Sequence, residues 1–216
     1  PMMVPAIVIL DRMVTTVLPP MLTAATGMDE LSHSLEAWCS PAYHPMAEGI
    51  AVEGIRLVRN YLPTAVTSGS DVEARTQMLV ASMMGATAFQ RGLGAMHALA
   101  HPLGALYNAH HGTLNAVLMP YVLVANRQAI EPRIIHLARS IDIPNASFDS
   151  FLDWVLELRE TVSIPQNLED LGIDDNQADL IGKMAEVDPS AGTNPILFDA
   201  SQYQSIFMNA LYGNLS

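Results

Sequence analysis

The chain consists almost entirely of apolar stretches with helical spacing, separated by prolines and glycines. In residues 22–39, for example, Leu31, Leu35 and Trp38 recur three to four positions apart, which places them on one face of a helix. Only residues 4–10, VPAIVIL, have the β-branched, proline-flanked character of a strand, and we interpret them as a short buried strand. The pattern predicts an all-α fold, a multi-helix bundle of about eight or nine helices with a short N-terminal strand-like segment.

Breaks in this pattern predict where the helices begin and end. Asp71 is expected to cap a long helix that stops at the glycines of residues 92–94. Two helices are expected over residues 95–126, separated near Asn108. Pro102 predicts a kink or a restart just after His101, because proline cannot donate to the helical ladder. Further helices are expected over residues 22–39, over 46–60, and in three or four segments after Pro132, the last over 201–211.

Composition limits the functions open to such a bundle. The 216 residues suit one domain over residues 1–216, which should bury roughly 70% of its unfolded surface. No apolar run approaches the roughly 18 residues of a membrane-spanning helix, and no export signal is visible, so we expect a cytoplasmic protein. With 22 acidic and 10 basic residues, the formal charge of -12 argues against nucleic acid or an anionic membrane as partner. Small-molecule chemistry is favoured, and the single cysteine, Cys39, fits a reducing compartment.

Acid and imidazole side chains occur at the spacing that metal sites on helices use. Asp29 with His33, and His97 with His101, are four positions apart, so each pair can reach one ion from one helix face. A single such pair is usually an ordinary surface or core pair. Here, however, four of the seven histidines fall within residues 97–111, a stretch without lysine, arginine or carboxylate. Uncharged imidazoles in apolar surroundings need partners, and a metal ion supplies several at once.

The donor types indicate which ions suit this site. One carboxylate with several imidazoles suits iron or zinc better than magnesium or calcium, which prefer oxygen ligands. Without cysteine ligands, the site does not look like a structural zinc finger. The adjacent histidines His110 and His111 are both candidates for the last ligand position at this stage.

Two long segments carry a family resemblance. LTAATGMDELSHSLEAW at 22–38 and GLGAMHALAHPLGALYNAHHGTLNAVLMPYVLVAN at 92–126 resemble the signature segments of the iron-containing (group III) alcohol dehydrogenases. The resemblance extends over most of the chain, through SIPQNLEDLGI at 163–173, MAEVD at 184–188 and TNP at 193–195. It implies a dehydroquinate synthase-like α domain, the carboxy-terminal metal-binding and catalytic half of such an enzyme.

The resemblance also implies roles for individual residues. Asp29, His33, His97 and His111 would be the ligands of Fe²⁺, with Zn²⁺ as the alternative ion, and His101 would be a catalytic non-ligand that relays the alcohol proton. His111 is preferred over His110 because it keeps the expected spacing from His97. Family members bind NAD or NADP mainly through an N-terminal dinucleotide-binding domain, whose glycine-rich strings do not occur in this sequence.

The resulting expectation is a metal-assisted NAD(P)-dependent dehydrogenase that interconverts an alcohol and an aldehyde or ketone. The chain alone is expected to retain metal but to lack activity, because hydride must reach a nicotinamide. The resemblance is also compatible with a homodimer. The alternatives are a related glycerol dehydrogenase, maleylacetate reductase or dehydroquinate synthase, or a helical scaffold or dimerisation domain whose metal site holds no ion.

Overall fold

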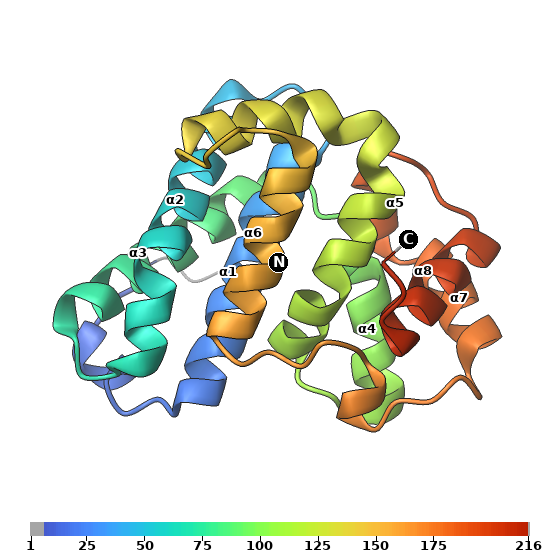
Figure 1. Ribbon diagram of the computed structural model, residues 1–216, viewed down its shortest axis with the longest axis horizontal. Coiled ribbons are helices and arrows are strands. Elements are labelled where there is room, and N and C mark those ends of the chain that lie inside the picture. The colour runs from blue at the N-terminus through green and yellow to red at the C-terminus, as the bar shows by residue number, and fades with distance from the viewer. Residues whose placement is uncertain (1–6, 216) are drawn as a thin grey trace.

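The computed structural model describes residues 7–215 and confirms the all-α prediction. Within that range the chain forms eight α-helices, joined by loops and four short 3₁₀ turns (Figure 1). The helices are α1 (Pro20–Cys39), α2 (Pro45–Thr67), α3 (Val72–Ala88), α4 (Ala95–Tyr107), α5 (His111–Ser140), α6 (Phe148–Thr161), α7 (Ala178–Glu186) and α8 (Ala200–Tyr212).

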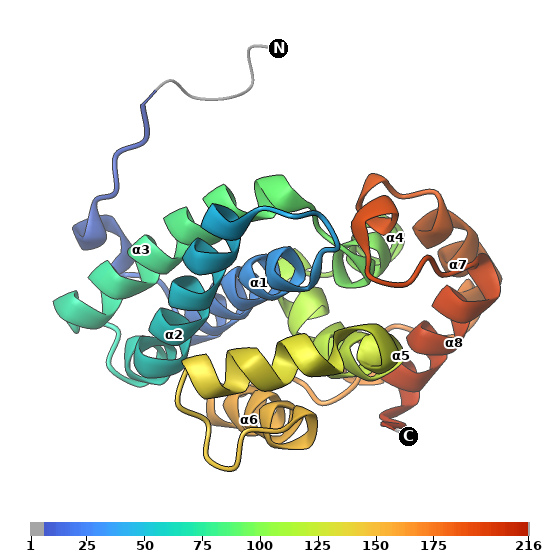
Figure 2. The same ribbon diagram turned by 90° about the horizontal axis from the view of Figure 1, so that it is seen from above.

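Helix α1 is the centre of the bundle. Fourteen of its twenty residues are buried, and it packs against α2, α3 and α5. Helix α4 packs against α5 and α7, and α7 packs against α8, so that α5 lies between the two groups of helices (Figures 1 and 2). The metal candidates are carried by α1, α4 and the first turns of α5, which all meet at this junction.

Local sequence explains most helix boundaries. Asp71 caps α3 as predicted, because its side chain accepts a hydrogen bond from the Ala74 amide. Asn108 ends α4 in the left-handed conformation with φ of 53°, which asparagine tolerates better than most residues. This one-residue change of direction allows α5 to begin three positions later and brings residue 111 back toward α4.

Prolines interrupt the helices less than predicted. Helix α4 runs through Pro102, so the expected restart after His101 does not occur. Helix α2 likewise continues through Pro63, and α5 passes both Pro120 and Pro132. The ribbon of α5 changes direction in its second half (Figure 1). Each proline removes one backbone hydrogen bond, and packing against neighbouring helices outweighs this loss.

The expected N-terminal strand is wrong where the structure describes it. Residues 4–6 lie outside the described range, and residues 7–10 have no regular secondary structure. They are exposed and not buried, with Ile7 81% and Ile9 85% accessible, and they extend away from the helices (Figure 2). Residues 7–9 are β-branched, which favours a strand. A strand also needs a partner strand, however, and none is present among residues 7–215. Over the same residues, no helix has the length and apolar character to cross a bilayer.

Candidate metal centre

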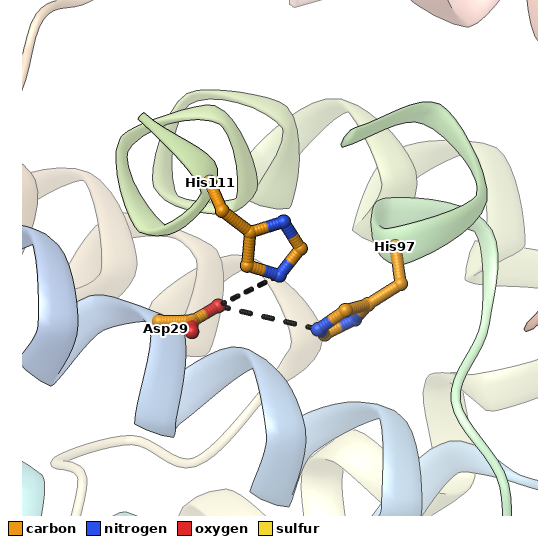
Figure 3. Close-up of side chains that lie close together, drawn as sticks. All are labelled: Asp29, His97 and His111. Carbon is orange, nitrogen blue, oxygen red and sulfur yellow. Dashed lines mark ion pairs between the residues drawn. The ribbon is translucent and has the colours of Figure 1, made fainter. Parts of the chain in front are cut away.

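Three of the four predicted ligands converge at the junction of α1, α4 and α5. Asp29 Oδ1 lies 3.6 Å from His111 Nε2 and 4.0 Å from His97 Nε2. All three atoms lie within 4.8 Å of one another, and the side chains point toward a common position (Figure 3). We call Asp29 Oδ1, His97 Nε2 and His111 Nε2 the ligand triad.

His33 lies beside the triad but is not one of its members. Its Nε2 is 4.0 Å from the other carboxylate oxygen of Asp29, and its ring stacks on His97 with centroids 4.9 Å apart. Its Nδ1 is 3.8 Å from Glu30 Oε2.

His101 lies next to the triad on α4, one turn after His97. Its ring stacks on that of His111 with centroids 5.6 Å apart, and its Nδ1 is 2.8 Å from Asp188 Oδ2. The side chain is 45% exposed, whereas that of His97 is 2% exposed. The structure thus places His101 between the triad and solvent, with a carboxylate as its partner.

His110 has a separate task. It is the N-cap of α5, where its Nδ1 accepts from the Thr113 amide at 3.4 Å, and it is exposed. Of the two adjacent histidines, His111 is the one that lies in the triad.

Two residues that the sequence analysis did not assign to the site surround the triad. Glu36 Oε2 lies 2.7 Å from His97 Nδ1, and the same carboxylate accepts from the amides of Gly94 and Met96 at the start of α4. Asn115 Nδ2 donates to Asp29 Oδ1 at 2.7 Å. One sequence signal was available for Asn115, which follows His111 by four positions and therefore shares its helix face. Glu36 follows His33 by three positions, but its partner is His97 on α4, a contact that the sequence does not show.

A close approach of α1 and α5 brings Asp29 to His111. A Cβ atom at Gly112 would lie 2.4 Å from the Ala25 carbonyl oxygen and 3.1 Å from Asp29 Cβ. Only glycine fits between these backbones, so the residue after His111 sets the distance between the two helices.

Burial and charge shift the titration of the groups around the triad. Burial lowers the pKa of His111, and the neighbouring imidazoles add to this, against the opposing charge of Asp29. Burial raises the pKa of Glu30. Burial alone would lower the pKa of His33, but the nearby carboxylates of Glu30 and Asp29 outweigh it and raise that pKa. His111 therefore keeps its lone pair free of a proton more readily than an exposed histidine.

The donor set fits a first-row divalent ion. One carboxylate oxygen and imidazole nitrogens are ligands for iron or zinc. A tetrahedral ion with bonds of about 2.0–2.1 Å holds its ligand atoms roughly 3.3 Å apart. From their 3.6 and 4.0 Å separations, Asp29 Oδ1 would approach His111 Nε2 by about 0.3 Å and His97 Nε2 by about 0.7 Å. Asn115, whose Nδ2 contacts the triad, also has a buried Oδ1 with no hydrogen-bond partner among the described residues.

The fold and this cluster define a class of protein, namely helical domains that gather a carboxylate and several imidazoles where helices meet. Residues 23–211 match the model of the Fe-containing alcohol dehydrogenase family, C-terminal part. The chain therefore belongs to the iron-containing alcohol dehydrogenase family.

Individual relatives agree with this assignment. The chain is 36% identical to 4-hydroxybutyrate dehydrogenase from Cupriavidus necator over 218 residues, covering 97% of this chain and 56% of that protein. It is also 36% identical to alcohol dehydrogenase 4 from Saccharomyces cerevisiae, covering 95% of this chain and 55% of the relative. The crystal structure of a 1,3-propanediol oxidoreductase superposes with a TM-score of 0.89 at 35% identity, covering 93% and 55% of the two chains. The chain thus spans just over half the length of the relatives it matches.

Proposed function

We propose that this chain is the metal-binding, catalytic part of an NAD(P)-dependent alcohol dehydrogenase that interconverts a small alcohol and its aldehyde or ketone. Asp29, His33, His97 and His111 would hold a divalent iron ion, and zinc suits the same donors. The observation that carries the proposal is the ligand triad with His101 beside it, in a chain of this family. The nicotinamide that accepts the hydride would be bound mainly by the N-terminal part of the relatives' length, which this chain does not match.

The bound ion would act as a Lewis acid on the substrate oxygen. The surrounding residues prepare the site for it. Glu36 fixes the His97 ring by accepting from Nδ1, which leaves the Nε2 lone pair directed toward the other two triad atoms. Gly112 holds α5 against α1, which places Asp29 opposite His111. Both arrangements exist before any substrate arrives, so little reorganisation is required.

His101 would move the proton of the alcohol. It is the one imidazole of the group that is both half-exposed and hydrogen-bonded to a carboxylate outside the cluster, Asp188. A proton taken from the substrate hydroxyl can therefore pass to solvent through a ring whose orientation is fixed. No such residue is needed by a site that only holds a metal for stability.

The metal content of the purified protein tests the proposal directly. Protein purified anaerobically without chelator should carry one iron or zinc per chain, and Asp29→Ala and His97→Ala should each lose it. His136→Ala is the matched control, because it removes an exposed imidazole that stacks on Trp38, away from the triad. Unchanged metal content in both triad variants would sink the proposal.

The activity is tested in a longer protein, in which this chain is joined to an N-terminal cofactor-binding part of the kind proposed for the relatives. This longer protein should reduce NAD or NADP with short alcohols, and His111→Ala should abolish both this activity and metal binding. Activity that survives without metal would favour a metal-independent member of the superfamily, such as a maleylacetate reductase.

A further inference from the structure

Asn115 contacts every atom of the ligand triad through a single nitrogen. Its Nδ2 lies 2.7 Å from Asp29 Oδ1, 3.1 Å from His111 Nε2 and 3.2 Å from His97 Nε2. The residue is fully buried, and its Oδ1 has no hydrogen-bond partner within residues 7–215. The orientation of this amide is therefore set by the triad alone.

This contact pattern favours one protonation pattern of the triad. The amide nitrogen has two N–H groups and no acceptor site, so it can donate to Asp29 Oδ1 and to one imidazole Nε2 at a time, and that Nε2 must offer a lone pair. An imidazole that accepts here carries its proton on Nδ1. For His97 the same tautomer is required from the opposite side of the ring, where Nδ1 donates to Glu36.

Asn126, another buried asparagine of α5, differs from Asn115 in that both ends of its amide are hydrogen-bonded. Asn126 uses both ends of its amide: Nδ2 donates to Asn194 Oδ1 at 3.1 Å, and Oδ1 accepts from Asn194 Nδ2 at 2.8 Å. Asn115 leaves its oxygen unsatisfied, which is unfavourable for a buried acceptor. Its place beside three metal-type ligand atoms is thus not explained by amide pairing of the kind that Asn126 makes.

We propose that Asn115 is a positioning residue that prepares the triad for the metal ion. Without an ion, its amide holds Asp29 Oδ1 in place with one N–H and offers the other to the imidazole nitrogens, which lie 3.1 and 3.2 Å away. Since an N–H group cannot bind a cation, the amide gives up the imidazole nitrogens when the ion binds, and keeps Asp29, whose carboxylate has lone pairs to spare. This inference rests on the proposed function, because it gives Asn115 a purpose only if the triad binds a metal.

Asn115→Leu tests the proposal, because leucine keeps the shape of the side chain and removes the donor. Zinc affinity, measured by competition with a chromophoric chelator, should fall about 10–100-fold, the usual effect of losing a partner of a metal ligand. The ligand-field spectrum of the Co²⁺-substituted protein should change as well. Asn167→Leu is the control: it removes a side-chain amide whose hydrogen bond, from the Asp170 backbone, involves neither α4 nor the triad, so it should leave the zinc affinity and the cobalt spectrum unchanged.

A measurement on the unsubstituted protein covers the case in which Asn115→Leu does not fold. The side-chain amide ¹⁵N resonance of Asn115 should shift when zinc is added, whereas that of Asn126 should not. An unmoved Asn115 resonance in zinc-loaded protein, or a folded Asn115→Leu with the zinc affinity and cobalt spectrum of the parent, overturns the proposal and leaves the proposed function intact. Parent protein that binds neither zinc nor iron overturns both.

Discussion

The Glu36 carboxylate of α1 accepts from His97 Nδ1 of α4 at 2.7 Å, and it also accepts from two backbone amides at the start of that helix. One buried side chain thus both begins α4 and orients the imidazole that α4 presents to the triad. A charge buried to this extent is tolerated because it is fully hydrogen-bonded. The first turn of α4 and the geometry of the ligand triad are consequently coupled.

Glu36→Gln should therefore lower metal affinity and stability together. The amide group of glutamine can accept at only one end, so Met96 loses its partner if the oxygen replaces Oε2, and both Gly94 and His97 lose theirs if it replaces Oε1. We expect zinc affinity to fall about 10–100-fold and the free energy of unfolding to fall by about 1–3 kcal/mol, measured by chelator competition and urea unfolding. Glu53→Gln, which removes a partly exposed ion pair with Arg56, is the control and should change neither quantity appreciably. Full affinity in Glu36→Gln would contradict the coupling.

Gly112→Ala should damage the site by separating two helices. The new methyl group would meet the Ala25 carbonyl oxygen at 2.4 Å, and backbone atoms cannot move aside as a flexible side chain could. We expect a loss of about 1–3 kcal/mol in unfolding free energy, together with weaker zinc binding because Asp29 and His111 move apart.

Gly49→Ala is the control for Gly112→Ala, and we expect it to stabilise the protein instead of destabilising it. Gly49 is exposed within α2, and a Cβ there would have no neighbour within 4 Å. Alanine should stabilise the protein by about 0.5–1 kcal/mol through higher helix propensity, with zinc affinity unchanged. If both glycine variants had the same effect, the close approach of α1 and α5 would not be what positions the site.

His101→Ala should separate metal binding from catalysis. The imidazole stacks on His111 but faces Asp188, so we expect the full metal content with hydride transfer lowered about 10²-fold or more, as for loss of a general acid-base group. Activity is assayed in the form that includes the cofactor-binding part, and metal by elemental analysis. Asp188→Asn should give a smaller loss of activity in the same direction. Loss of metal in His101→Ala would make this residue a ligand.

Cys39 should be unreactive until the chain unfolds. Burial raises the pKa of its thiol to about 12, from 9.0 when free, and the residue is 8% exposed. A colourimetric disulfide reagent at pH 8 should label it only in denaturant.

The same thiol makes the stability of the protein depend on alkaline pH. Because the unfolded chain releases the Cys39 proton above pH 9.0 and the folded chain does not, the contribution of Cys39 to stability falls as the pH rises from there toward 12. Cys39→Ala should remove this part of the alkaline loss of stability, and rapid labelling of the native protein would contradict its burial.

Local sequence patterns predicted the fold class and the start of α3 correctly, because caps and apolar spacing act within a few residues. The same patterns brought Asp29 and His111 to notice as ligand candidates. They could not reveal that Asn115 meets Asp29 across 86 positions, or that Glu36 meets His97 across 61, because only tertiary packing makes such contacts. Packing likewise carries α4 through Pro102, and its absence leaves Ile7 exposed.

The assembly of the triad from three helices has a consequence during protein synthesis. Asp29 leaves the ribosome well before His97 and His111, and on α1 alone it has no more than His33 to share an ion with. The ligand set would exist only after α5 has emerged and docked on α1. The proposed ion would therefore find its full set of ligands only once these three helices have packed together, late in synthesis.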